Sequence, residues 1–158
     1  METTGTRILY MITKVGIILP HVFNTQLTYC VVKNIYTLVN NPKYDFVIFF
    51  EDLTPPMMKI PCAMMNVAEI HCFNGTLIST TLNNTVLSLK AINQARKIFY
   101  VWDLEWLRGQ NNYLSNLDVY RNPNLELFTR SESYAKAIDN YSNRLPKIAT
   151  DFNLEQIC

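Results

Sequence analysis

The segment Trp102-Asp-Leu-Glu-Trp106 holds the residue types with the clearest chemistry in the chain. Tryptophan faces suit stacking on sugar rings. The carboxylates of Asp103 and Glu105 could hydrogen-bond sugar hydroxyls, or one of them could deprotonate an attacking hydroxyl held within reach. The favoured alternative is that the tryptophans fill core beside the next helix while the acids are solvated. Asp103 and Glu105 are therefore candidate catalytic groups, and Trp102 and Asp103 are candidate ligand contacts.

Two further positions carry candidate chemistry. His21 could act as a base, although a lone histidine in a loop is more often simply exposed. Arg130-Ser131 falls where a strand is expected to meet a helix N-terminus, and such a place attracts phosphates and carboxylates. The favoured alternative there is that Ser131 is an ordinary helix N-cap.

Glycines are too few for the known phosphate-binding motifs. Lys14 and Gly16 are candidate ligand contacts in the expected first loop, but a dinucleotide fingerprint needs three glycines at that place. With four glycines in the whole chain, neither G-x-G-x-x-G nor G-x-x-x-x-G-K-[ST] occurs. We expect no cofactor, and chemistry of the NAD or P-loop type is disfavoured.

The cysteines and histidines do not suggest a metal site. The four cysteines contain no C-x-x-C pair, and the two histidines are far apart in the sequence. No metal is therefore assigned. The four cysteines are Cys30, Cys62, Cys72 and Cys158.

Length and charge limit the classes of function. The 158 residues suit one domain, 1–158, with residues 1–6 expected to be disordered. A net charge of +1 without a basic run argues against nucleic acid as a partner. No apolar stretch approaches the ~18 residues of a membrane helix, and the start lacks the basic region of a secretory signal. We expect a cytoplasmic protein that does not bind membranes.

Strand and helix patterns alternate along the chain. Strands are expected at residues 8–13, 45–51, 97–102, 125–129 and 147–150, with two more around the Asn74-Gly turn between 69 and 82. Helices are expected from an Asn24 cap to residue 38, at 62–67, from residue 83 or 84 to 94, at 112–120 and at 132–141. In the helix that ends at 94, the residues expected to face the core are Val86, Leu87, Ala91 and Ile92.

This alternation predicts βαβ units, because parallel strands need a crossover connection. The predicted fold class is α/β, a Rossmann-like three-layer αβα sandwich with a mainly parallel sheet. Ligands of such sheets bind beyond the carboxyl ends of the strands. The residues expected there also include Glu51, Asp52, Thr80 and Thr81.

Five successive segments carry a family resemblance: Gly75-Thr-Leu-Ile-Ser-Thr-Thr, the expected helix to Gln94, Arg96 to Trp106, Leu125 to Ser131 and Asp151 to Ile157. Together they resemble the N-terminal, acceptor-side domain of GT-B-type glycosyltransferases, and in particular short glycosyltransferase-like proteins of T4-like marine phages. The resemblance implies acceptor contacts from the first loop and from Trp102 to Glu105. It also implies a second, donor-binding domain, and no position in this sequence matches the donor-binding residues.

Two functions follow from the resemblance. One is a glycosyltransferase, or one subunit of a split one, with a nucleotide sugar or carbohydrate as ligand and a donor-domain partner or a homodimer as assembly. The alternative is a non-catalytic binding or structural module of phage origin. Fold analogy alone does not decide between them.

Overall fold

The computed structural model describes residues 11–52, 56, 58–92, 96–108 and 112–158. The expected disordered start, 1–6, lies outside them. The strands are β1 (Thr13–His21), β2 (Tyr44–Asp52), β3 (Ala63–Asn66), β4 (Thr76–Ser79), β5 (Arg96–Val101), β6 (Leu125–Thr129) and β7 (Lys147–Ile148). The helices are α1 (Gln26–Leu38), α2 (Leu82–Lys90), α3 (Tyr113–Arg121), α4 (Glu132–Ser142) and α5 (Leu154–Ile157), with the 3₁₀ helices η1 (Val67–Cys72), η2 (Glu105–Leu107) and η3 (Thr150–Phe152).

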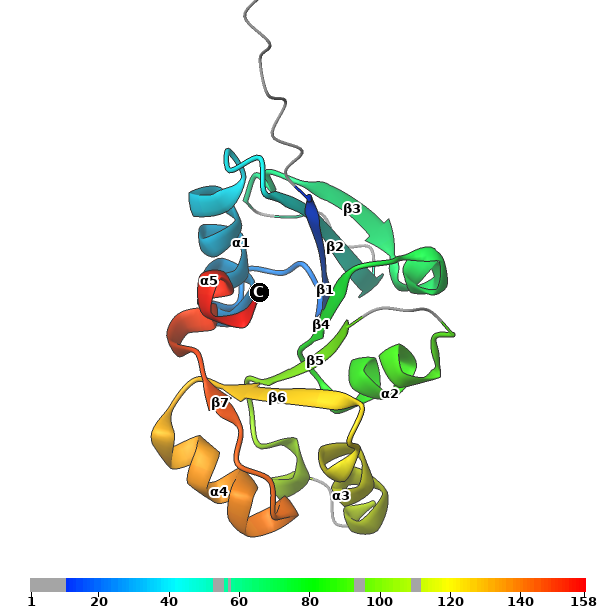
Figure 1. Cartoon of the computed structure of the whole chain (residues 1–158), viewed down its shortest axis with the longest axis vertical. Helices are drawn as coiled ribbons and strands as arrows, with labels where there is room; N and C mark the ends of the chain where they lie inside the picture. Colours follow the sequence, from blue (N-terminus) through cyan, green and yellow to red (C-terminus); the bar gives the residue numbers. More distant parts are fainter. Residues whose placement is uncertain (1–10, 53–55, 57, 93–95, 109–111) are drawn as a thin grey trace, which may run out of the picture.

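Within the described residues, seven strands form one sheet in the order β3-β2-β1-β4-β5-β6-β7, and every neighbouring pair is parallel. The chain runs outward from β1 to β3, returns to place β4 on the other side of β1, and then continues to β7 (Figure 1). The predicted Rossmann-like three-layer sandwich is confirmed. None of the described helices combines the length and the apolar character that crossing a membrane requires.

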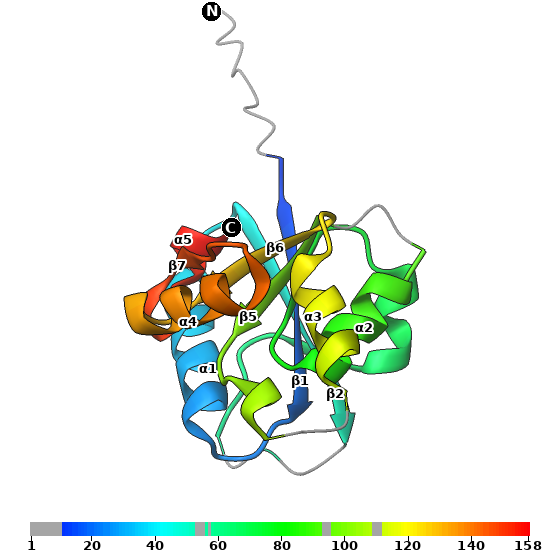
Figure 2. The same ribbon diagram turned by 90° about the horizontal axis from the view of Figure 1, so that it is seen from below.

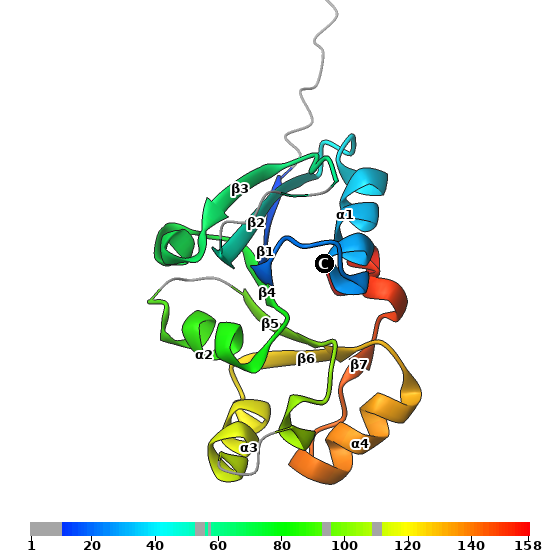
Figure 3. The ribbon, with the colours of Figure 1, turned by 180° about the vertical axis from the view of Figure 1, so that it is seen from behind.

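Helices α1 and α5 cover one face of the sheet. Alternate β1 residues such as Ile17 and Leu19 point to this face, because successive strand side chains point to opposite sides. They pack with Ile35 of α1 and Ile157 of α5 in one buried cluster. Figure 3 shows the C-terminal segment lying beside α1, so two helices far apart in the sequence cover the same face of the sheet.

Helices α2, α3 and α4 cover the opposite face. Leu82, Tyr120 and Ile138, one from each helix, share a buried cluster with Phe99 of β5 and Leu127 of β6. In Figure 2, α2 and α3 lie side by side on this face. The sheet therefore has a packed helical layer on each side.

The expected first strand at 8–13 is wrong in its described part. Met11 and Ile12 precede the strand and are 91% and 59% exposed, whereas β1 begins at Thr13. Residues 8–10 lie outside the described part of the chain. Lysine, glycine and proline interrupt the apolar run of β1, which is why its pattern resembled a loop.

The region between β2 and α2 also differs from expectation. The expected helix at 62–67 is mainly the edge strand β3, and the expected hairpin at Asn74-Gly75 does not form. Instead η1 precedes β4, which pairs in parallel with β1 and β5. A Cβ atom on Gly75 would lie 2.5 Å from the Lys14 carbonyl oxygen, so this glycine permits a close backbone approach. Pairing with distant strands overrode the local turn signal.

Helix α2 buries a different face from the one expected. Leu87 is 39% exposed and Ile92 98% exposed, although Ala91 is buried as expected. Thr81 caps the helix, so its first turn begins at Leu82 and the inward face carries small polar residues. The buried residues of α2 are Leu82, Asn84, Thr85 and Ser88.

Candidate ligand-binding crevice

A cavity of about 380 Å³ lies at the carboxyl ends of β1, β4 and β5. Helix α1 leads away from β1 toward β2, and α2 leads away from β4 toward β5, so the strand order reverses here. Such a reversal leaves a crevice in which open parallel sheets bind their ligands. We call this cavity the crevice. It is lined by Pro20, His21, Thr25, Gln26, Leu27, Thr80, Thr81, Trp102, Asp103, Glu105 and Arg108.

His21 forms the β1 side of the crevice as the last residue of that strand. Its ring lies 4.8 Å from the Phe23 ring, centroid to centroid. Its buried Nδ1 atom has no hydrogen-bond partner within the described part of the chain. Because buried polar atoms are nearly always paired, a ligand hydroxyl is a chemically suitable partner for this imidazole.

Thr80 and Thr81 bring the end of β4 to the crevice. The Thr80 hydroxyl donates to the Ile18 carbonyl oxygen at 2.9 Å, which ties the two strands together at their exit. The Thr81 hydroxyl accepts from the Asn84 amide at 3.2 Å and caps α2. Both threonines therefore fix the crevice wall.

Trp102 lines the crevice at the end of β5, and one of its faces is already covered. The Arg130 guanidinium lies 5.1 Å from the centroid of the Trp102 ring and 4.7 Å from that of Tyr134. It also donates to the Tyr134 hydroxyl at 2.8 Å. Arg130 thus positions the indole by cation–π contact.

Trp106 has a different environment from Trp102. Its ring is stacked on Tyr141 with 4.4 Å between centroids, and it meets Tyr120 edge-on at 5.3 Å. Both tryptophans are partly buried against a core cluster, as the core interpretation expected, and Trp102 also lines the crevice.

Both candidate carboxylates already have interaction partners within the chain. Asp103 forms an ion pair with Arg108 and accepts from the Leu104 amide. Glu105 accepts from the Leu82 amide at 2.9 Å, at the N-terminus of α2. Burial raises the pKa of Glu105, and the hydrogen bond from Leu82 partly offsets that rise.

Ser131 is the N-cap of α4, which confirms the favoured prediction, and its hydroxyl accepts from the Tyr134 amide at 3.4 Å. Neither Ser131 nor Arg130 is among the residues that line the crevice. Arg130 reaches it only through Trp102, so the two expected contacts of this loop are not brought into one anion site.

Lys14 and Gly16 lie inside β1, not in the loop after it, and therefore away from the crevice. A Cβ atom on Gly16 would come within 2.8 Å of the Phe49 ring and 2.9 Å of the Leu77 side chain. This glycine serves close packing of the sheet and its neighbours, which accounts for its presence without a phosphate.

Five crevice residues were not among the expected contacts: Pro20, Thr25, Gln26, Leu27 and Arg108. Gln26 and Leu27 are the first two residues of α1, and the sequence pattern there predicts a helix but no ligand contact. Arg108 is five residues after Asp103, and this opposite-charge spacing is the sequence signal that could have predicted their ion pair.

Across the described ranges, no cluster of three or more His, Cys, Asp or Glu side chains has the arrangement of a metal site.

No protein-family profile, curated protein or solved structure matches this chain.

Proposed function

We propose that the chain is a glycosyltransferase-like, acceptor-side domain whose crevice binds a carbohydrate hydroxyl. The observation that carries this proposal is the convergence of His21, Trp102 and Asp103 on one cavity at the strand-order reversal. The indole offers an apolar surface to a sugar ring. The imidazole and carboxylate offer hydrogen bonds to hydroxyls.

In this proposal His21 is the base. It accepts the proton of the acceptor hydroxyl, whose oxygen bonds to the anomeric carbon of a nucleotide sugar as the bond to the leaving diphosphate breaks. Asp103 orients the acceptor, and Arg108 sets the position of Asp103 through their ion pair. The nucleotide sugar would be held by a separate donor-binding partner or by a second copy of the chain.

A non-catalytic binding module is the second candidate, favoured by a specific observation. Glu105 is bound to the Leu82 amide, and Asp103 is paired with Arg108. Carboxylates engaged in this way stabilise the crevice wall and leave fewer groups free for proton transfer. Such a module would bind sugar without turnover.

Calorimetric titration with nucleotide sugars and with simple sugars, together with a hydrolysis assay, tests the proposal. We expect His21→Gln to reduce turnover, while His71→Gln serves as the matched control because His71 is exposed in η1. Sugar binding without turnover under any condition would select the binding module. Absence of binding to every nucleotide sugar and simple sugar would contradict both candidates.

A further inference from the structure

Two more cavities border α1, and one of them adjoins the crevice. Gln26 lines both the crevice and a cavity of about 440 Å³ between α1 and η3. Tyr29 and Lys33 line that cavity and a third one of about 500 Å³, which reaches Met58. The second cavity borders α1 from Gln26 to Thr37 and the third from Tyr29 to Tyr36, so the two lie side by side on adjacent faces of this 13-residue helix, which is about 20 Å long. We call the second and third cavities together the α1 groove.

The cavity beside η3 is lined mainly by hydroxyl, carboxamide and carboxylate groups, the kinds that exchange hydrogen bonds with sugar hydroxyls. Within the described residues, the side chains of Tyr29, Lys33 and Asp151 make no hydrogen bond or ion pair with one another or with other side chains. Its lining residues are Gln26, Tyr29, Cys30, Lys33, Asn34, Thr37, Thr150, Asp151 and Asn153.

The backbone that presents Asp151 is strained and held in place. Asp151 and Phe152 have φ angles of 51° and 60°, a region that a bulky residue such as phenylalanine rarely adopts. The buried Tyr100 hydroxyl donates to the Ala149 carbonyl oxygen at 2.5 Å and accepts from the Phe152 amide at 3.2 Å. Asn34 donates to the Asp151 carbonyl oxygen at 2.9 Å. Strain maintained in this way is typical of ligand sites.

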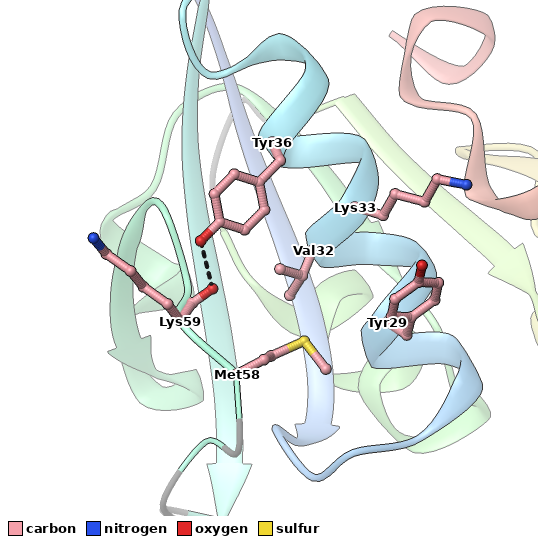
Figure 4. Close-up of a pocket in the computed structure, with 6 residues that line it drawn as sticks. All are labelled: Tyr29, Val32, Lys33, Tyr36, Met58 and Lys59. Atoms are coloured by element: carbon pink, nitrogen blue, oxygen red, sulfur yellow. Dashed lines mark hydrogen bonds between the residues drawn. The ribbon is translucent and has the colours of Figure 1, made fainter.

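The third cavity is walled by aromatic rings and alkyl groups (Figure 4). Tyr29 and Tyr36 are 54% and 47% exposed, and the Tyr36 hydroxyl donates to the Lys59 carbonyl oxygen at 3.0 Å. Figure 4 shows the ammonium groups of Lys33 and Lys59 pointing away from each other, with Lys33 directed toward the C-terminal segment. The rings are therefore the main contact surface of this cavity.

We propose that the α1 groove binds an oligosaccharide chain whose terminal residue occupies the crevice. This inference rests on the proposed function for the crevice and names the acceptor class as an extended glycan. Sugars present apolar C–H faces and hydroxyl edges, and the groove offers aromatic walls next to a polar cavity. Tyr29 lies between the two parts of the groove and separates two sugar positions.

A printed array of neutral and acidic glycans, from monosaccharide to hexasaccharide, followed by titration of the best series, tests this inference. We expect affinity to rise about tenfold or more from monosaccharide to hexasaccharide, which corresponds to about 1.4 kcal/mol. Tyr29→Ala and Asp151→Asn should remove this gain and leave monosaccharide affinity unchanged. Tyr113→Ala is the matched control, since Tyr113 is 50% exposed on α3.

The outcomes separate the groove from the crevice. Equal affinity for short and long glycans, or a length gain that survives Tyr29→Ala, would overturn the groove. Self-association of the protein that Tyr29→Ala abolishes would assign this face to a dimer and also overturn it. A length gain lost in Tyr29→Ala but unaffected by Trp102→Ala would support the groove and contradict the crevice function instead.

Discussion

The crevice and the α1 groove differ in how their polar side chains are used. In the crevice, Asp103 pairs with Arg108, Glu105 accepts from the α2 N-terminus, and Trp102 carries a guanidinium on one face. In the groove, Tyr29 and Asp151 leave their side-chain polar groups without such contacts in the described residues. The crevice side chains therefore contribute to wall stability as well as to the proposed ligand site. In the groove, Asn34 and Tyr36 make internal hydrogen bonds, whereas the side chains of Tyr29 and Asp151 are available to a ligand.

The largest expected effect concerns the strained turn that presents Asp151 to the groove. Tyr100→Phe removes the hydroxyl that joins Ala149 to Phe152 and leaves a buried carbonyl and a buried amide without their partner. We expect a loss of about 1–3 kcal/mol in the free energy of unfolding, measured by urea denaturation. Tyr36→Phe, which alters an exposed hydroxyl, is the control. An unchanged midpoint for Tyr100→Phe would show that the strained turn is held by other contacts.

Glu105 tests the wall of the crevice. Glu105→Ala should cost about 1–2 kcal/mol, because the Leu82 amide loses its acceptor, and Glu105→Gln should cost less because a carboxamide oxygen still accepts.

The pH dependence of Glu105 has a defined sign. Burial raises its pKa in the folded state, so the folded protein binds this proton more tightly than the unfolded chain does. Stability from this group is therefore present at low pH and is lost as pH rises through the folded pKa. Relative to Glu105→Gln, wild type should lose stability on going from below the ordinary pKa of 4.5 toward neutral pH. The opposite slope would contradict the buried position of this carboxyl.

Glu126, near the amino end of β6, should behave in the reverse way. The Arg96 guanidinium, 2.6 Å away, lowers the pKa of Glu126 to about 2. Its stabilisation is present above the ordinary pKa of 4.5 and is lost as pH falls toward about 2. Both side chains are 37% exposed, so solvent screening limits the loss to about 1 kcal/mol or less. Acid titration of wild type and Glu126→Gln by circular dichroism measures it, and identical acid midpoints would exclude this contribution.

The smallest effect is expected for the groove side chains. Tyr29→Ala and Lys33→Ala should change the free energy of unfolding by no more than about 0.5 kcal/mol, because both side chains are exposed and make no internal polar contact in the described chain. Thermal unfolding checks this. A loss comparable with that of Glu105→Ala would remove the distinction between the two regions.

The sequence was most informative where local signals and packing agreed. The β6 limits and the Ser131 cap match expectation, because a short apolar run and a capping serine define them locally. Part of the crevice lining was also predictable by position: Trp102, Asp103 and Glu105 follow β5, at the strand ends where parallel sheets bind their ligands.

Features set by distant contacts were not predictable. Lys14 and Gly16 belong to β1 because Phe49 and Leu77 pack closely over the glycine, a contact between segments far apart in sequence. The α1 groove was also missed. Asp151 lies more than a hundred residues from Tyr29, and only the tertiary fold places both beside one cavity.

The two tryptophans provide the most direct test of sugar binding in the crevice. Trp102 lines the crevice and Trp106 is stacked in the aromatic cluster, so their indole N–H signals in a ¹⁵N-resolved NMR spectrum report the two places within one molecule. On titration with the oligosaccharide that binds best on the array, we predict a saturable shift of the Trp102 signal and a stationary Trp106 signal. A stationary Trp102 signal at saturating oligosaccharide would contradict the proposed crevice.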